Sequence, residues 1–497
     1  MTDVLLTHSY HLPYDAKQVR KMQPYPPLGT LYAAAVLRSH GISVKVFDTM
    51  LQDPTVGFAQ VLARYKPAIV AIYEDDFNFL SKMCLTRMRQ VAFEMIEAAL
   101  RNNAVVVVHG SDATDHALLY LQAGASYVLH GESEVRLNEL VSALLVGDEP
   151  AEMPGIAYLD SHGSMVYRAS QPEAVQWLQL PPPARDLIDV APYRDAWRKA
   201  HGYFSLNMVS SRGCPYRCNW CAKPISGDRF HVRRAKFVAE ELRELKVKYG
   251  ADHVWFGDDV FALDHRWVCE LALEVERGGT QVPFKIQSRA DLMTPGTVDC
   301  LRRAGCTEVW MGVESGSQKV LDSMEKGLDL EDVDTARSLL ANAGIRACYF
   351  LQFGYPGERW AEIQQTIELV RRTRPDDIGV SVSYPLPNTR FYERVQHQLG
   401  TKRNWRDSDD LCATFTAAYK NELYVAVRDA LHAEVDSWRA PSSESASRLR
   451  NLWDRVKELE PVTRNVKPTE LGPAQKPEYK RSQFIPTRSL SIASGEV

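Results

Sequence analysis

Long hydrophobic runs are missing from this sequence. No apolar segment approaches the roughly 18 to 20 residues that span a bilayer. The first residues, MTDVLLTHSYHLPYD, lack a basic region followed by a long apolar core. We therefore expect a cytoplasmic protein with no membrane span. An excess of positive charge is also missing, because the net charge is -4 and the pI is near 6.4. Nucleic acid selects strongly basic surfaces, so we expect no nucleic-acid partner.

A spacing of cysteines typical of a disulfide framework is missing as well. Nine cysteines is an odd number, and six of them are scattered: Cys84, Cys269, Cys300, Cys306, Cys348 and Cys412. We therefore expect free thiols in a reducing compartment. What the sequence does have is globular composition, with 45% hydrophobic and 25% charged residues among 497. This length is enough for two or three domains, each with its own core.

Strand and helix signals alternate in the first part of the chain. Residues 26–41 have a helical pattern, and continuous apolar stretches predict strands at residues 4–8, 44–48, 68–73, 105–111 and 127–132. Such strands joined by helices are typical of a parallel sheet covered on both faces. We therefore expect a doubly wound, flavodoxin-like α/β domain over residues 1–145. Ligands of such sheets bind at the carboxyl ends of the strands.

The same alternation returns after a proline-rich segment. Residues 146–195, with LPPPARDL at 180–187, predict a linker. Strand signals then occur at residues 204–210, 253–256, 284–288, 308–314, 347–353 and 378–383. Six βα units over residues 196–400 predict a partial (β/α)6 TIM-like barrel, because a closed barrel has eight. Residues 401–460 predict a helical carboxyl-terminal region, and the proline-rich residues 461–497 predict a poorly ordered tail.

Three cysteines stand close together in SSRGCPYRCNWCAKP, on a loop that follows a predicted strand. Cys214, Cys218 and Cys221 could bring three thiolates to one point. Structural zinc normally takes four ligands in two pairs, and only His231 could be the fourth here, so a zinc site is the weaker alternative. Iron–sulfur clusters are usually held by cysteine thiolates. A cluster held by three would keep one iron open for catalysis.

The spacing CxxxCxxC, with Trp220 before the last cysteine, resembles the radical SAM superfamily. The resemblance implies that Cys214, Cys218 and Cys221 hold a [4Fe-4S] cluster whose open iron binds S-adenosyl-L-methionine (SAM). It also implies reductive cleavage of SAM to a 5'-deoxyadenosyl radical, with a flavodoxin or ferredoxin-type protein as electron donor.

Further segments resemble the SAM-binding segments of that family and occur in the same order. VWFGDDVF suggests Asp258 or Asp259 as the partner of the methionyl amino group, and IQSRADL suggests Arg289 as the partner of its carboxylate. MGVESGSQKVL suggests Glu314 and Ser315 for the ribose hydroxyls. The alternative for the acids is a solvated loop, and for Arg289 a surface ion pair.

The amino-terminal segments PPLGTLYAAAVLRSHG, VVHGSDAT and GASYVLHGESE make the chain similar to the cobalamin-binding branch of the superfamily. This branch includes C-methyltransferases and the anaerobic ring cyclase of bacteriochlorophyll synthesis. The resemblance places five residues near cobalamin: Tyr73, Gly110, Ser111, Gly131 and Glu132. The DxHxxG motif that supplies an axial histidine in many cobalamin proteins is absent, so we assign no lower ligand.

The resemblance implies a C-methyltransferase that acts on an unactivated carbon of a small-molecule substrate. The 5'-deoxyadenosyl radical would remove a hydrogen atom, and the substrate radical would take a methyl group from methylcobalamin. One alternative is a cyclase or rearrangement enzyme with the same cofactors. Two others are a radical enzyme without cobalamin and a zinc-stabilised scaffold protein.

Overall fold

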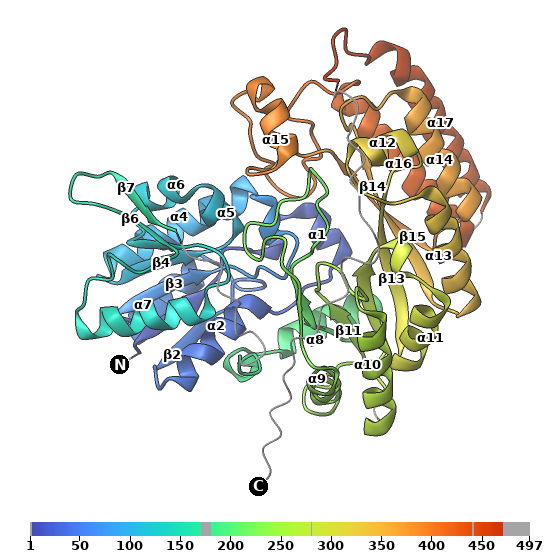
Figure 1. Ribbon diagram of the computed structural model, residues 1–497. Helices are drawn as coiled ribbons and strands as arrows, with labels where there is room; N and C mark the ends of the chain where they lie inside the picture. Colours follow the sequence, from blue (N-terminus) through green and yellow to red (C-terminus); the bar gives the residue numbers. More distant parts are fainter. Residues whose placement is uncertain (1, 170–179, 280, 440–441, 471–497) are drawn as a thin grey trace.

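Two sheets lie side by side in the computed structural model, which describes residues 2–169, 180–279, 281–439 and 442–470 (Figure 1). The first sheet is built from the amino-terminal third of the chain and the second from the part that follows. Residues 170–179 of the predicted linker and residues 471–497 of the predicted tail lie outside the described residues. No helix among the described residues is both long and apolar enough to cross a membrane.

The first sheet has the strand order β2-β1-β3-β4-β5-β6-β7, and β1 to β5 pair in parallel. Leu5 contacts one core cluster, while its neighbours Val4 and Leu6 contact another, so both faces of the sheet are covered. This explains why the strands are continuously apolar. The parallel strands are β1 (Val4–Thr7), β2 (Val44–Phe47), β3 (Ile69–Tyr73), β4 (Val105–His109) and β5 (Tyr127–Leu129). The helices are α1 (Ala16–Lys21), α2 (Leu28–Ser39), α3 (Val56–Tyr65), α4 (Thr86–Arg101), α5 (Ser111–Asp115), α6 (Ala117–Gln122) and α7 (Glu134–Val146).

A hairpin extends this sheet beyond residue 145. Strand β6 (Ile156–Leu159) pairs antiparallel with β5, and β7 (Met165–Arg168) pairs antiparallel with β6. The expectation that residues 146–195 are only a linker is therefore wrong for this part. Each strand has four residues, too few for a clear alternation of apolar and polar positions. The linker region also contains the start of α8 (Ala191–His201), whose Tyr193 and Trp197 are buried.

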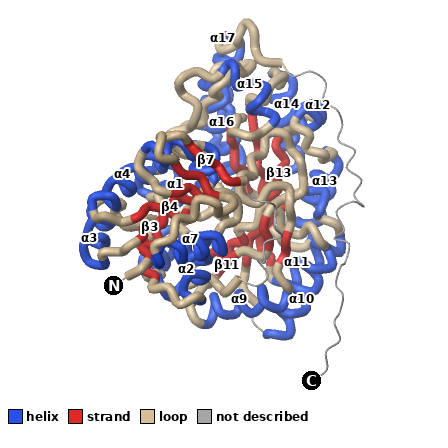
Figure 2. The backbone as a smooth tube through the Cα atoms, turned by 60° about the vertical axis from the view of Figure 1, so that its left-hand side comes forward, coloured by secondary structure: helices blue, strands red, loops and turns tan. Residues whose placement is uncertain are grey.

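The second sheet is the predicted half-barrel. Its order is β15-β14-β13-β12-β11-β8, and all neighbouring strands are parallel. The strands are β8 (Ser205–Met208), β11 (His253–Phe256), β12 (Phe284–Ser288), β13 (Cys306–Glu314), β14 (Arg346–Phe353) and β15 (Asp377–Val382). A short ribbon of β9 (Ser211–Arg212) and β10 (His231–Val232) follows β8. Figure 2 shows the strands of both sheets next to each other, with helices on the outer sides.

Along a strand of the half-barrel, successive side chains point to opposite faces of the sheet. Phe284 and Ile286 of β12 are fully buried in the core cluster shared with the outer helices, whereas Lys285 and Gln287 are partly exposed. Because side chains alternate along a strand, Lys285 and Gln287 face the concave side. The outer helices are α9 (Ala235–Val247), α10 (His265–Gly278), α11 (Pro295–Ala304), α12 (Gln318–Ser323), α13 (Leu330–Asn342) and α14 (Trp360–Thr373).

Three helices follow the last strand: α15 (Arg390–Val395), α16 (Asn421–Arg439) and α17 (Ser443–Val462). Trp453 and Leu452 of α17 pack against the main core, and Val456 is buried in it. Pro461, where we expected the tail to begin, lies inside α17. The carboxyl-terminal helices therefore belong to the same packed unit as the half-barrel.

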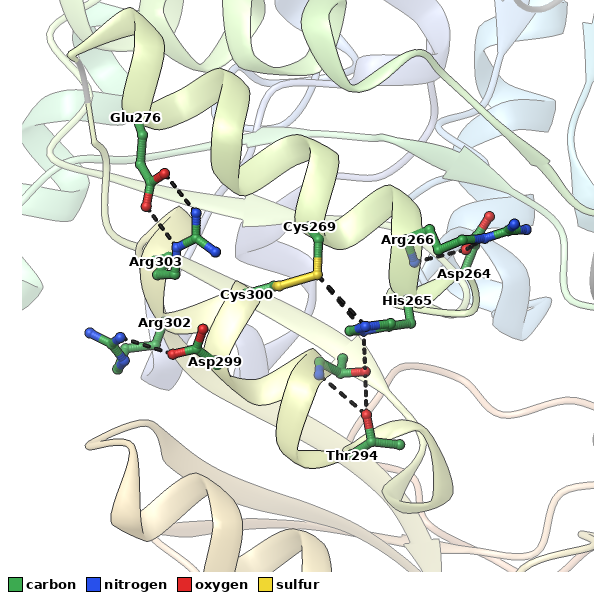
Figure 3. The surroundings of a disulfide bond; sticks show 11 residues. Asp264, His265, Arg266, Cys269, Glu276, Thr294, Asp299, Cys300, Arg302 and Arg303 are labelled. Carbon is green, nitrogen blue, oxygen red and sulfur yellow. Dashed lines mark hydrogen bonds and ion pairs between the residues drawn. A yellow bond between two sulfur atoms is a disulfide. The ribbon is translucent and has the colours of Figure 1, made fainter.

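One pair of cysteines does not remain as thiols. Cys269 of α10 and Cys300 of α11 form a disulfide, with their Cα atoms 5.0 Å apart (Figure 3). The expectation of free thiols is wrong for this pair and holds for the other seven cysteines. The two residues are separated by 31 positions, and only the packing of the two helices brings them together. Spacing in the sequence could not reveal that contact.

Candidate functional site

The cysteine loop begins where β9 ends. Cys214, Cys218 and Cys221 are free and partly exposed. Gly213, just before them, has φ 77°, and a Cβ there would lie 2.0 Å from the carbonyl oxygen of Arg229, so only glycine fits. Burial, together with nearby negative charge, raises the pKa of Cys214 to about 11 and that of Cys221 to about 12. The thiols are therefore neutral at pH 7 until a metal stabilises their ionised form.

In the described structure the three loop thiols are spaced more widely than the sulfur ligands of one zinc ion. Within the described part of the chain, three ligand atoms lie within 4.8 Å of one another at Cys84, Asp112 and His116, and the loop cysteines form no such group, with or without His231. Sulfur ligands of one tetrahedral zinc ion would be about 3.8 Å apart, since the Zn–S distance is about 2.3 Å. The Asp112 group is explained without metal, because Arg89 binds both oxygens of that carboxylate.

A cavity of about 150 Å³ lies between the cysteine loop and the first sheet. Cys214 and Cys221 line it from one side, and Tyr73, Ser111 and Glu132 line it from the other. The carboxyl ends of β3 and β4 in the first sheet thus face the loop that follows β8 and β9. Two carboxyl-terminal edges, one from each sheet, enclose a single space.

The two acids after β11 have different environments. Asp258 is 1% exposed and accepts hydrogen bonds from the Ser210 hydroxyl at 2.7 Å, from the Ser210 amide and from the Ser211 hydroxyl. Burial raises the pKa of Asp258 to about 6, although these bonds oppose the shift. Asp259 lines the cavity, accepts a hydrogen bond from the Gly213 amide at 3.2 Å and pairs with Lys82. Of the two candidates for the methionyl amino group, Asp259 is the one at the cavity.

Arg289 joins the barrel to the cysteine loop. It is 5% exposed, and its guanidinium pairs with Asp291 at 2.9 Å and donates to the carbonyl oxygens of Lys326 and Gly327. The same group stacks on the ring of Tyr216, 3.8 Å from its centroid. This is a buried network and differs from the surface ion pair that was the alternative.

Glu314 ends β13 with φ 64° and is paired with a buried lysine, Lys326, at 2.8 Å. Lys326 Nζ also lies 6.0 Å from the ring of Trp220 in the cysteine loop. Ser315 is fully buried, and its hydroxyl contacts the Thr366 hydroxyl at 3.2 Å on α14. Glu314 thus lies beside the cysteine loop, whereas Ser315 holds its own loop against a helix.

The residues predicted for cobalamin lie at the ends of β3, β4 and β5. The Tyr73 ring stacks on His109, with centroids 4.0 Å apart. Gly110 has φ 146°, and a Cβ there would lie 2.8 Å from the side chain of Glu74. Among the described residues, the buried Ser111 hydroxyl and both carboxylate oxygens of Glu132 have no hydrogen-bond partner. Gly131, with φ 72°, faces the carbonyl oxygen of Ile225 in the barrel domain. Unpartnered polar atoms at a cavity are suited to a ligand.

Sequence reasoning missed five charged residues that line the cavity: Asp76, Lys82, Glu134, Arg212 and Lys223. Arg212 and Glu134 are each 4% exposed in their side chains and form an ion pair between the two domains. Burial raises the pKa of Asp76 well above its usual range. The run of acids Glu74, Asp75 and Asp76 directly after a predicted strand was a usable signal for this edge. The partners of Lys82 and Arg212 depend on how the domains pack.

The comparison with family models matches residues 208–370 to the Radical SAM superfamily. Among curated proteins, the chain is 26% identical over 386 residues to an uncharacterized methyltransferase of Pyrococcus horikoshii, covering 77% of this chain and 81% of that protein. It is 23% identical to the hopanoid C-3 methylase of Methylococcus capsulatus, covering 76% and 70%. It is also 23% identical to an anaerobic magnesium-protoporphyrin IX monomethyl ester cyclase of Rubrivivax gelatinosus, covering 75% and 66%.

Solved structures share the fold. The radical S-adenosylmethionine methyltransferase TsrM of Kitasatospora setae, with cobalamin and a [4Fe-4S] cluster bound, superposes with a TM-score of 0.66 at 20% identity and covers 81% of this chain and 76% of its own. The cobalamin-dependent radical enzyme OxsB, with aqua-cobalamin bound, has a TM-score of 0.69 at 16% identity and covers 92% and 71%. Both alignments cover so much of this chain that they include at least part of the amino-terminal sheet as well as the half-barrel.

Proposed function

Because residues 208–370 belong to the radical SAM superfamily, we propose that the protein is a cobalamin-dependent radical SAM enzyme that methylates an unactivated carbon of a small molecule. The observation that carries this proposal is the cavity between the domains. Cys214 and Cys221 line it from the barrel, and Tyr73, Ser111 and Glu132 line it from the first sheet. A site between two carboxyl-terminal edges can bring two cofactors close together.

The residues present fit both groups. Three free thiols on one loop are the ligand set of a [4Fe-4S] cluster with one open iron. On the opposite wall, the unpartnered Ser111 hydroxyl and the Glu132 carboxylate can bind the polar edge of a large cofactor. The finer assignment is part of the proposal: the first sheet is a flavodoxin-like cobalamin domain, residues 196–400 form the radical SAM domain, and the helices after residue 400 cover the barrel.

When bound, the cluster with SAM and the cobalamin would supply, respectively, a hydrogen-abstracting radical and a transferable methyl group. The chain's own residues would bind SAM and hold the cysteine loop in place. Asp259, with Lys82 displaced, offers a carboxylate to the SAM ammonium. Arg289 fixes the cysteine loop through Tyr216, and Lys326 fixes Glu314 beside that loop. Water is kept out by the buried Arg212–Glu134 pair at the domain junction.

One protein partner and a cellular location follow from this chemistry. Reductive cleavage of SAM needs a low-potential electron donor, for which we propose a flavodoxin or ferredoxin-type protein. Metal thiolates and such donors need a reducing environment, which supports a cytoplasmic location. Cyclisation or rearrangement with the same cofactors is the second candidate, supported by the similarity to the Rubrivivax gelatinosus cyclase.

The test begins with anaerobic reconstitution. We expect brown protein with about four iron and four sulfide per chain and one bound corrinoid, and 5'-deoxyadenosine when SAM and dithionite are added. A variant with Cys214, Cys218 and Cys221 all changed to alanine should lose cluster and deoxyadenosine, whereas Cys412→Ala, outside the loop, should keep both. Label from methyl-labelled SAM that reaches the product supports methylation. Product formed without label would support cyclisation or rearrangement instead.

A further inference from the structure

The concave face of the half-barrel carries a lysine that has no hydrogen-bond or ion-pair partner among the described residues. Lys285 lies on β12 and is partly exposed. Among the residues that the structure describes, its ammonium group makes no hydrogen bond or ion pair. The rings of Tyr25 and Trp255 lie 5.8 and 6.0 Å from Nζ. A lysine that projects into an interior beside aromatic rings is an available anion-binding group.

The nearest acid along the sheet is already engaged. Glu308 is the strand partner of Lys285. One of its carboxylate oxygens accepts a hydrogen bond from the Trp310 indole at 2.6 Å, and the other pairs with Arg346 at 2.5 Å. Both carboxylate oxygens of Glu308 are thus engaged by other groups, and among the described residues Glu308 forms no ion pair with Lys285.

Charges of both signs surround Lys285. Burial lowers the pKa of Lys285, while the charge of Glu308 opposes this and that of Arg346 adds to it. The charge of Lys285 also helps to lower the pKa of Lys21 on α1, which is an exposed residue. Asp377 lies between two arginines, 3.9 Å from Arg346 and 3.6 Å from Arg439. The acids of this region are therefore shared among several cations.

An aromatic wall continues from Lys285 across the sheet. The rings of Trp310 and Phe350 stack with their centroids 4.9 Å apart and an interplanar angle of 30°, and both residues are partly exposed. Gly379 lies against them on β15, where a Cβ would be 3.1 Å from the Phe350 ring. Because this position has no side chain, the Phe350 and Trp310 rings can lie close to β15.

One strand links this interior to the cysteine loop. Arg289 comes four residues after Lys285, which corresponds to about 13 Å along an extended chain. The Arg289 guanidinium stacks on Tyr216 of the cysteine loop. Lys285 and the cysteine loop therefore lie at opposite ends of β12 and face the same concave side.

We propose that the substrate of this enzyme is a planar aromatic carboxylate, bound with its carboxylate at Lys285 and its ring against Trp310 and Phe350. The inference rests on the proposed function, because a substrate so held extends toward the cluster-binding loop. A phosphate could also bind an ammonium group, so the shared chemistry is an oxyanion. The aromatic wall is what favours a ring-bearing carboxylate over free phosphate.

The test is anaerobic calorimetry on the reconstituted holoprotein with four probes: indole-3-propionate, its uncharged amide, 3-cyclohexylpropionate and inorganic phosphate. Indole-3-propionate should bind about 10-fold or more tightly than the amide, as expected for a hydrogen-bonded ion pair. Lys285→Met should remove that difference. Phe350→Leu should weaken the two indole probes equally and leave 3-cyclohexylpropionate unchanged. Lys236→Met, a matched change of an exposed lysine on α9, should change nothing.

Equal binding of acid and amide by the natural protein would overturn the inference, as would a Lys285→Met variant that still prefers the acid. Phosphate binding that depends on Lys285, without indole binding, would identify a phosphate site and also overturn it. Cluster content and deoxyadenosine formation without substrate serve as separate readouts. Their presence in Lys285→Met shows that the variant is folded, and their absence in the natural protein would refute the proposed function itself.

Discussion

Lys82, on the loop after β3, pairs with Asp259, at the end of β11 in the other domain. Lys82 thus occupies the carboxylate that we assign to the SAM ammonium. Asp259→Asn should weaken SAM binding about 10-fold or more, because a charged partner is lost. Lys82→Met should leave SAM binding unchanged or strengthen it a few-fold. Equilibrium dialysis of labelled SAM with the reconstituted protein measures both.

The control for this prediction is Lys248→Met. It removes an exposed lysine at the end of α9 in the half-barrel and should not alter SAM affinity. If Lys82→Met weakened binding as much as Asp259→Asn does, the ion pair itself would be part of the site, and the competition between Lys82 and SAM would be excluded.

The Arg212–Glu134 pair should contribute strongly to stability. Both side chains are buried at the domain junction, so neutralising Glu134 takes a charged partner away from a buried guanidinium. Glu134→Gln should cost about 3–5 kcal/mol in the free energy of unfolding, measured by urea denaturation. Glu244→Gln, which breaks the exposed pair with Lys248, should cost less than about 1 kcal/mol. A loss for Glu134→Gln as small as this would show that water reaches the junction.

The same pair has a pH dependence with a definite sign. Arg212 holds the pKa of the Glu134 carboxyl below its usual value of 4.5. Its contribution is therefore complete above pH 4.5 and is lost as the pH falls through the lower folded-state value. Thermal unfolding between pH 3 and 6 should show a steeper acid loss for the natural protein than for Glu134→Gln. Parallel curves would contradict this assignment.

Glu358 should give the stability of the protein a pH dependence opposite to that of Glu134. It is fully buried after β14, one oxygen accepts a hydrogen bond from the Gly354 amide, and burial raises its pKa to about 8. Stability is therefore greatest below pH 4.5, where the group is protonated in both states, and falls as the pH rises toward 8. Glu358→Gln, which mimics the neutral acid, should have an effect below about 1 kcal/mol at pH 5 and should stabilise by about 4–5 kcal/mol at pH 8.5. Equal melting-temperature changes at both pH values would contradict the raised pKa.

The Cys269–Cys300 disulfide should stabilise the outer layer of the barrel. The two residues are separated by 31 positions, and closing a loop of this size is worth about 3–4 kcal/mol in the chain-entropy model. The double variant Cys269→Ser with Cys300→Ser should lose about this much in urea denaturation. Treating the natural protein with a reductant should give the same loss, and Cys306→Ser treated in the same way serves as a control for general thiol effects. An unchanged midpoint would show that the bond does not form in solution.

Sequence predicted the sheets well because their strands are continuously apolar or strictly alternating. HVWF and FKIQS begin and end where β11 and β12 do. The hairpin β6–β7 was missed because each strand has four residues. Among the site residues, Cys214 and Cys221 could be found from spacing alone. The Lys82–Asp259 and Arg212–Glu134 pairs could not, because each joins two domains whose relative placement is fixed by long-range packing.

The junction that holds Arg212 determines how this protein can be divided for experiments. A fragment limited to residues 196–400 would keep the arginine and lose Glu134, so the buried ion pair beside the cysteine loop could not form. It would also lose the wall formed by Tyr73 and Ser111. Shortened versions that omit the first 150 residues are therefore unsuitable for metal loading, and protein for such experiments should keep both sheets.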